Sequence, residues 1–197
     1  KTPKDKKHIL ALADAREYLI KTARVGGTMG KQGVEWTFSQ LHPKFTIRVA
    51  KMVRWARSHG FEDCGVLSAY RKPFLGVGGY SDKYNSLHSY GLAADFKDCS
   101  DGSGTRTART FYNHATRVVG LFNPYGSANA AEFNHYQGLP QNGREYRGTL
   151  RSTITGNGPI SKEKMWRVAD AITYRGSLDA SASHKHRHKK RYYAVLH

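Results

Sequence analysis

Apolar residues recur at helical spacing in several stretches of the chain. After Pro43, the apolar positions from Phe45 to Ala56 follow a three- and four-residue rhythm, and lysine and arginine fill the other side. His59 and Gly60 then form a helix stop, a possible cation followed by a glycine cap. The same kind of spacing predicts further helices over 8–22, 105–119 and 161–174.

Short apolar runs between these stretches predict strands at 64–69, 92–96 and 131–136. Glycines after residue 25 end the first helix, and the stretches 73–85 and 137–160 are expected to be loops. The resulting order of elements predicts an α+β fold with a small antiparallel sheet flanked by helices. We divide the chain into an N-terminal helix with a glycine-containing connection (1–41), a core (42–160), a C-terminal helix with a linker (161–183) and a basic His/Lys/Arg tail (184–197).

The composition indicates a folded, strongly basic protein. Of 197 residues, 39% are hydrophobic, which supports a packed core, and no apolar run reaches the roughly 18 residues of a membrane span. Lysine and arginine outnumber acids by 32 to 15, and the excess extends over the body as well as both ends. This charge predicts an anionic partner surface, which could be a cell-wall polymer, nucleic acid or anionic lipid; a basic surface that only keeps the protein soluble is the alternative. The run from His184 to His188 could bind metal adventitiously, but we expect it to be a solvated basic arm.

The segment from Ser86 to Asp95 reads SLHSYGLAAD and holds a histidine and an aspartate seven residues apart. On one helix this spacing gives about 10 Å of rise, which is too far for two ligands of one metal ion. If His88 instead lies on a loop that Gly91 turns into a strand, Asp95 can point back toward it. We therefore expect a loop-to-strand transition in this segment.

A second segment places Glu132 three residues before His135, beside the third strand candidate. Two histidines and one carboxylate, with water, form a catalytic zinc site with an open position. Zinc lowers the pKa of its water toward about 7, and a free carboxylate such as Glu132 then takes the proton. Arg71 follows the first strand candidate and could donate to a developing oxyanion. The alternative is that His88 and His135 are hydrogen-bonded core histidines, with Asp95 paired to a lysine.

These segments resemble the zinc D-Ala-D-Ala carboxypeptidases, dipeptidases and related phage endolysins of the hedgehog-type (LAS) metallopeptidase fold. SLHSYGLAAD matches every fixed position of their pattern Ser-x-His-x-x-Gly-x-Ala-x-Asp. The upstream Ser-Ala-Tyr-Arg, ending at Arg71, resembles their Ser-x-Tyr-Arg, and the segment from Glu132 to His135 resembles their Glu-x-x-His. The motifs occur in the family's order, and the resemblance covers roughly residues 42–137.

The resemblance implies a role for each matching residue. It implies that one Zn²⁺ per chain is bound by His88, Asp95 and His135. Glu132 would be the general base and acid, and Arg71 would stabilise the substrate carbonyl or oxyanion.

Three residues near the motifs are predicted to bind substrate: Tyr70, Ser86 and Tyr136. The tyrosines could line a peptide cleft, but packing on a sheet explains them equally well. Family members often carry Trp immediately before the second histidine ligand, whereas this chain carries Asn134.

The leading hypothesis is a zinc-dependent peptidase that hydrolyses peptide bonds of peptidoglycan stem peptides, as a D-Ala-D-Ala carboxypeptidase or a related endopeptidase. Its expected partners are peptidoglycan and an anionic cell-wall polymer. The alternative is a non-catalytic module of the same fold that binds cell wall or another polyanion; the presence of Glu132 favours the enzyme. A nucleic-acid binder would explain the charge, but the chain has no standard nucleic-acid motif.

Two cysteines, Cys64 and Cys99, are expected to form a disulfide. Each lies four residues from a motif residue, Cys64 before Ser68 and Cys99 after Asp95. If their two strands pair antiparallel, both cysteines fall at the same edge, within reach of a bridge. The alternative is two free thiols. A bridge implies an oxidising compartment, so we expect a periplasmic or secreted protein. The chain starts at Lys1 without an apolar leader, as both a processed exported protein and a trimmed chain would.

Overall fold

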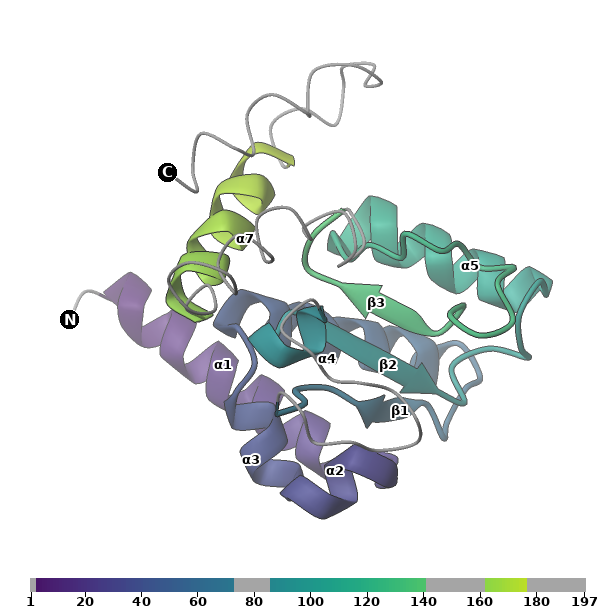
Figure 1. Ribbon diagram of the computed structural model, residues 1–197, viewed down its shortest axis with the longest axis horizontal. Coiled ribbons are helices and arrows are strands. Elements are labelled where there is room, and N and C mark those ends of the chain that lie inside the picture. The colour runs from purple at the N-terminus through teal and green to yellow at the C-terminus, as the bar shows by residue number, and fades with distance from the viewer. Residues whose placement is uncertain (1–2, 73–85, 141–161, 177–197) are drawn as a thin grey trace, which may run out of the picture.

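The computed structural model describes residues 3–72, 86–140 and 162–176. Within these ranges, helices surround a small antiparallel sheet, which confirms the expected α+β class (Figure 1). The expected loop at 73–85, most of that at 137–160 and the basic tail at 184–197 lie outside the described residues. In chain order the elements are α1 (Pro3–Lys21), α2 (Gly27–Gln32), α3 (Val34–Ser39), α4 (Pro43–Ser58), β1 (Gly65–Ser68), η1 (Leu87–Tyr90), β2 (Ala93–Lys97), α5 (Arg106–His114), η2 (Ala115–Val119), β3 (His135–Gln137) and α7 (Lys162–Gly176).

The sheet has the strand order β1-β2-β3, with both pairs antiparallel. On one side of β2, Val66 lies opposite Phe96, and after an irregularity in the register Ser68 lies opposite Asp95. On the other side, Asp95 lies opposite His135. The register therefore sets two of the predicted ligands beside each other.

Helix α4 begins and ends where the sequence predicts. Pro43 is its first residue, and Nδ1 of His42 accepts a hydrogen bond from the backbone N–H of Phe45 at 3.4 Å. Gly60, just beyond the end, has φ of 94°, a conformation that glycine adopts without strain. The apolar side of the helix is buried in the core, with Phe45, Val49, Met52, Val53 and Ala56.

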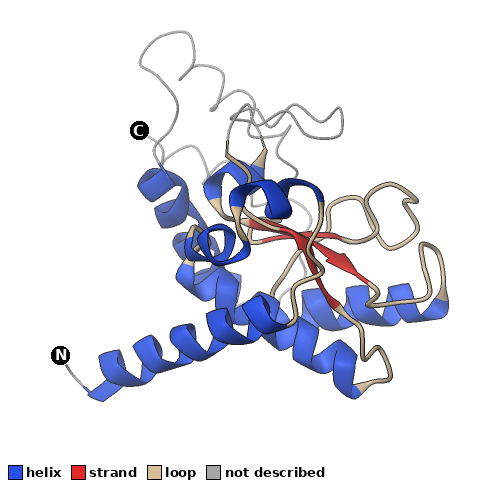
Figure 2. Ribbon diagram, turned by 90° about the horizontal axis from the view of Figure 1, so that it is seen from below, coloured by secondary structure: helices blue, strands red, loops and turns tan. Residues whose placement is uncertain are grey.

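One face of the sheet is covered by helices. The ring of Phe96 on β2 and that of Tyr136 on β3 both pack on Phe111 of α5, with ring centroids 5.3 and 5.2 Å apart. In Figure 1, α4 runs behind the strands, and Figure 2 shows the sheet with long helices along one side. Because neighbouring residues of a strand point to opposite faces, Asp95 and His135 lie on the face away from α5.

A disulfide joins the start of β1 to the end of β2. Cys64 precedes β1, Cys99 follows β2, and their Cα atoms are 4.4 Å apart. The antiparallel pairing expected from the sequence is what brings the two cysteines to the same edge of the sheet.

Two regions differ from the expectations. Residues 27–39 form the short helices α2 and α3 where a glycine-containing connection was expected, because side chains such as Met29 and Phe38 anchor them in the core. The third strand begins at His135 rather than at residue 131. The preceding residues form a turn, in which Oδ1 of Asn129 accepts the backbone N–H groups of Ala131 and Glu132 at 3.0 and 3.2 Å.

The last described helix, α7, packs next to η1. The indole nitrogen of Trp166 donates to the carbonyl oxygen of Tyr90 at 2.7 Å. Helix α7 also contacts α4, where Lys44 and Asp170 form an ion pair of 2.7 Å. Helix α7 is thereby fixed beside the segment that carries His88.

Candidate metal centre

His88 is placed by a short turn that leads into β2. It lies on the 3-10 helix η1, which ends at Gly91 in the left-handed conformation with φ of 67°. A Cβ at Gly91 would also collide with the backbone carbonyl of Gln40, so glycine is required there for two reasons. The expected loop-to-strand transition is confirmed in this form, and it brings His88 back toward Asp95.

Three ligand atoms from separate elements form a nearly equilateral triangle. Nδ1 of His135 lies 3.0 Å from Oδ1 of Asp95 and 3.3 Å from Nε2 of His88. The third side, from Nε2 of His88 to Oδ1 of Asp95, is 3.4 Å. Ligand atoms about 2.0–2.1 Å from a tetrahedral metal ion are about 3.3 Å from one another, so the triangle has the size of one coordination face. His88, Asp95 and His135 can therefore hold a metal ion together.

In each imidazole, the ring nitrogen that points away from Asp95 lies against a hydrogen-bond acceptor. Nδ1 of His88 lies 2.6 Å from the carbonyl oxygen of Ala69, which can only accept, so this nitrogen carries the proton. The amide nitrogen of Gln137 donates to the carbonyl oxygen of Leu139 at 2.6 Å, which turns its Oε1 toward Nε2 of His135 at 3.1 Å. Both rings thus turn their other nitrogen, Nε2 of His88 and Nδ1 of His135, toward Asp95. Such outer partners are typical of metal-binding histidines.

Burial and mutual contact shift the pKa values of the three groups. Burial lowers the pKa of His88 to about 4, so the ring is neutral at pH 7 and its inner nitrogen is available as a ligand. Burial alone would raise the pKa of Asp95, but the two imidazoles hold it well below its usual range. For His135, burial is the largest single effect and lowers the pKa, but the hydrogen bond and charge of Asp95 together with Gln137 and Glu132 outweigh it, and the pKa is raised. A carboxylate is thus kept ionised at the centre of a buried site, which favours a cation.

Arg71 approaches the same carboxylate from the opposite side. Its Nη1 lies 3.8 Å from Oδ2 of Asp95, whereas Oδ1 faces the histidines. The backbone N–H of Arg71 donates to the carbonyl oxygen of His88 at 3.2 Å, which ties the end of the first strand region to η1. A guanidinium is therefore held at the edge of the triangle, with its side chain 17% exposed.

Glu132 lies on the turn before β3, next to His135. The backbone N–H of His135 donates to the carbonyl oxygen of Glu132 at 3.0 Å. The negative charge of Glu132 is one of the smaller causes of the raised pKa of His135. Glu132 is half-buried and is not one of the three residues of the triangle. The structure thus brings Glu132 and Arg71 to the site that the sequence assigned to them.

The buried side chain of Asn123 fixes the turn that carries Glu132. Its amide nitrogen donates to the carbonyl oxygens of Glu132 and Phe133 at 3.0 and 3.1 Å. Its Oδ1 accepts from the backbone N–H groups of Tyr125 and Gly126 at 2.9 and 3.1 Å. One amide therefore uses its donors and its acceptor to join two turns. The ring of Tyr125, on the second turn, packs edge-on against His135 with centroids 5.6 Å apart.

The three predicted substrate-binding residues have different positions. Tyr136 is 1% exposed and packs in the core against Phe111, so it does not face the site. The physical reason is strand alternation: His135 points to the site, and the next residue must point away from it. Tyr70 is half-buried beside Trp36, with ring centroids 5.3 Å apart, and Ser86 is half-buried at the start of η1.

Two important residues were not predicted from the sequence. Gln137 could have been found from its place two residues after His135, which puts both on one face of a strand. Asn123 gave no such signal, because its role depends on which turns meet in space. Asn134, which stands where the family that the motifs resemble often carries Trp, has a structural role here. Its amide nitrogen donates to the carbonyl oxygen of Phe96 at 2.9 Å.

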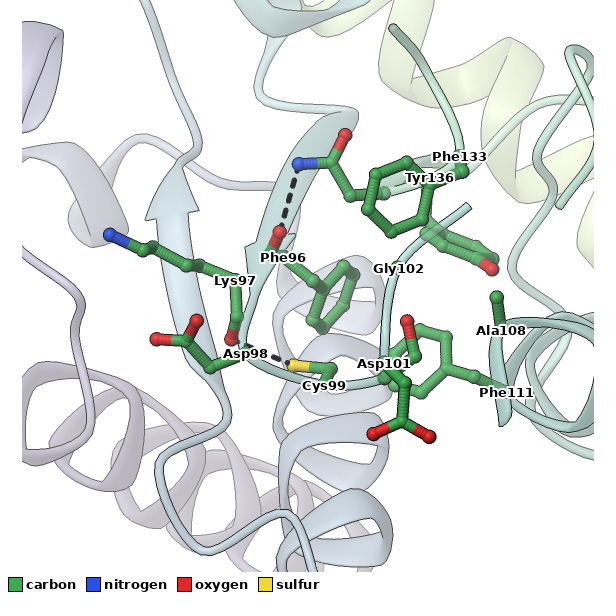
Figure 3. A pocket seen from close by; sticks show the side chains of 12 residues that line it. Phe96, Lys97, Asp98, Cys99, Asp101, Gly102, Ala108, Phe111, Phe133 and Tyr136 are labelled. Atoms are coloured by element: carbon green, nitrogen blue, oxygen red, sulfur yellow. Dashed lines mark hydrogen bonds between the residues drawn. The ribbon is translucent and has the colours of Figure 1, made fainter. Parts of the chain in front are cut away.

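A separate cavity of about 320 Å³ lies on the other face of the sheet, outside the metal centre. Its walls include Phe96 and Tyr136 from the strands and Phe111 from α5 (Figure 3). None of the three triangle residues lines it. We assign the chemistry to the triangle rather than to this cavity, because the ligand atoms and Arg71 meet there and Glu132 lies on the adjoining turn.

No protein-family model, curated protein sequence or solved structure gives a significant match to the chain. Among the described residues, no helix combines the length and apolar character that a membrane crossing requires.

Proposed function

We propose that the protein is a zinc-dependent peptidase that hydrolyses peptide bonds in peptidoglycan stem peptides, in the manner of a D-Ala-D-Ala carboxypeptidase or a related endopeptidase. The observation that carries this proposal is the His88–Asp95–His135 triangle, with the guanidinium of Arg71 beside Asp95 and Glu132 on the turn directly before His135. The motif resemblance names the substrate class and the hedgehog-type fold. The disulfide supports a periplasmic or secreted location.

The triangle fits Zn²⁺ in donor chemistry as well as in size. Imidazole nitrogen and carboxylate oxygen are common zinc ligands, and three protein ligands leave one position open. When bound, zinc would polarise the scissile carbonyl and lower the pKa of water. His88, Asp95 and His135 would hold the ion, with Ala69 and Gln137 orienting the two rings.

The side chains around the triangle supply the remaining steps of hydrolysis. Glu132 accepts a proton from the attacking water, whose oxygen adds to the carbonyl carbon. Arg71 donates hydrogen bonds to the carbonyl oxygen as negative charge develops on it. Glu132 then gives the proton to the departing amine nitrogen when the C–N bond breaks, so it ends the cycle as a carboxylate.

Changing Arg71 to alanine is expected to lower kcat by about 10²- to 10³-fold, because the developing oxyanion loses a fixed donor. The metal should stay bound, since the three ligands are unchanged. Steady-state kinetics on a short stem peptide, with metal analysis of the same sample, measures both. Loss of the metal together with the activity would show instead that Arg71 supports the ligand geometry.

Digestion of purified muropeptides tests the proposed activity. The zinc-loaded protein is incubated with muropeptides and the products are read by mass spectrometry; Arg71→Ala and chelator-treated protein are the controls. We expect shortened stem peptides with the wild type and almost none with either control. Intact muropeptides after prolonged digestion by the zinc-loaded protein would rule out the proposed substrate class.

A further inference from the structure

Helices α4 and α5, with the turn η2, contain basic residues without acidic ones. Residues 38–60 include five lysines and arginines and no aspartate or glutamate, and residues 102–131 include three arginines and again no acid. Acids are present elsewhere in the chain, and Asp101, which accepts a hydrogen bond from Thr107 of α5 at 2.9 Å, directly precedes the second stretch. Such a concentration of one charge sign marks a surface that attracts a polyanion.

The two helices lie side by side. The ring of Trp55 on α4 stacks on His114 of α5, with centroids 4.2 Å apart and planes within 9° of parallel. Further along, Nη1 of Arg48 donates to the carbonyl oxygen of Gly120 after η2 at 3.4 Å. The basic residues of both helices therefore belong to one continuous part of the molecule.

Some of these cations already have partners within the protein. Lys44 is paired with Asp170 at 2.7 Å, Arg54 with Asp14 at 2.9 Å, and Nε of Arg57 donates to the carbonyl oxygen of Cys64. These three contribute little to binding outside the molecule.

Of the remaining cations, four are exposed to solvent, and Arg48 is half-buried where it donates to the carbonyl oxygen of Gly120. The basic face consists of four exposed residues and the half-buried Arg48, and within the described part of the chain no ion pair is formed by any of the five. Its members are Arg48, Lys51, Arg106, Arg109 and Arg117.

The basic face is directed away from the metal centre. Phe111 and Ala115 of the α5–η2 segment are buried against the core, on the side of the sheet that Phe96 faces. The triangle lies on the other side of the same strands, as residue alternation along β2 requires. A polymer bound to the basic face would therefore leave the metal centre open to substrate.

We propose that the basic face binds a linear, flexible polymer with a phosphodiester in each repeat, of the kind attached to bacterial cell walls. The choice of a wall polymer rests on the proposed function. The spacing of the cations also favours a flexible chain. Along α5 and η2 the rise is about 4.5 Å from Arg106 to Arg109 but about 12 Å from there to Arg117, and a flexible backbone adapts to such unequal steps.

The test compares two variants with the same loss of charge. One carries Lys51→Gln, Arg106→Gln and Arg117→Gln on the basic face. The matched control carries Lys31→Gln, Lys97→Gln and Arg167→Gln, which change exposed cations elsewhere. Binding of fluorescently labelled poly(glycerol phosphate) is measured by fluorescence anisotropy. The salt concentration is varied between about 0.05 and 0.3 M, because the affinity for a polyanion depends on ionic strength.

We expect the basic-face variant to bind about 50-fold more weakly than the wild type at about 0.15 M salt. It loses three phosphate contacts, each of which releases about 0.7 of a counterion when it forms. The control should change the affinity by less than about 3-fold. Equal weakening in both variants would show that only net charge matters and would overturn the proposal. Tighter binding of a duplex DNA of equal charge, lost in the same variant, would overturn it in favour of nucleic acid.

Hydrolysis of a short soluble stem peptide separates this proposal from the peptidase. The basic-face variant should cleave the peptide at the wild-type rate but digest whole cell walls more slowly. If the wild type cleaves no peptide, the proposed function fails while the binding result stands on its own.

Discussion

Replacing Glu132 by glutamine is expected to reduce peptide hydrolysis by about 10²- to 10⁴-fold while the metal stays bound. Glutamine has nearly the same shape, so the turn held by Asn123 keeps its backbone contacts. Its amide oxygen cannot take the proton of the attacking water, which removes the general base. Turnover of a stem peptide and the metal content of the purified variant are the two measurements.

A matched control for this variant is Glu35→Gln, which makes the same chemical change at an exposed residue of α3. It should keep full activity. Near-normal turnover by the Glu132 variant would mean that the carboxylate is structural and that another group accepts the proton. Activity lost together with the metal would mean that Glu132 takes part in holding the ion.

Removal of the disulfide by changing Cys64 and Cys99 to serine should lower the free energy of unfolding by about 4 kcal/mol. The bridge connects residues 35 positions apart, and loop-closure entropy in the unfolded chain accounts for this magnitude. Urea denaturation of the oxidised wild type, the reduced wild type and the double variant measures the effect.

The reduced wild type and the double serine variant should unfold at the same urea concentration, because both lack the same cross-link. If the oxidised wild type also unfolds at that urea concentration, the bridge does not stabilise the fold. Two reactive thiols in denatured, unreduced protein would show that it does not form, and the proposed oxidising compartment would lose its support.

The elements predicted best from the sequence are those whose own residues determine them. Helix α4 has a complete apolar side, a proline at its start and a glycine just beyond its end, all within one stretch. The turn at Gly91 was also predictable, because a histidine and an aspartate seven residues apart can meet only if the chain reverses between them. These signals are local and need no knowledge of the rest of the fold.

The features that were not predicted depend on distant contacts. Helices α2 and α3 are too short to show a clear periodicity, and burial of Phe38 in the core stabilises what local propensity does not. Tyr136 could not be assigned to a face until the register of β3 was known. Asn123 acts by joining two turns, and no spacing in the sequence indicates which turns will meet.

Metal analysis combined with anomalous diffraction tests the central claim most directly. The protein is loaded with zinc, freed of excess metal and compared with Asp95→Asn, which keeps the shape of the side chain but removes its charge. We predict one zinc ion per chain, bound by Nε2 of His88, Oδ1 of Asp95 and Nδ1 of His135 at about 2.0–2.2 Å, and much weaker binding by the variant. A wild-type protein without metal, or with metal only on the tract from His184 to His188, would contradict the assignment of this site.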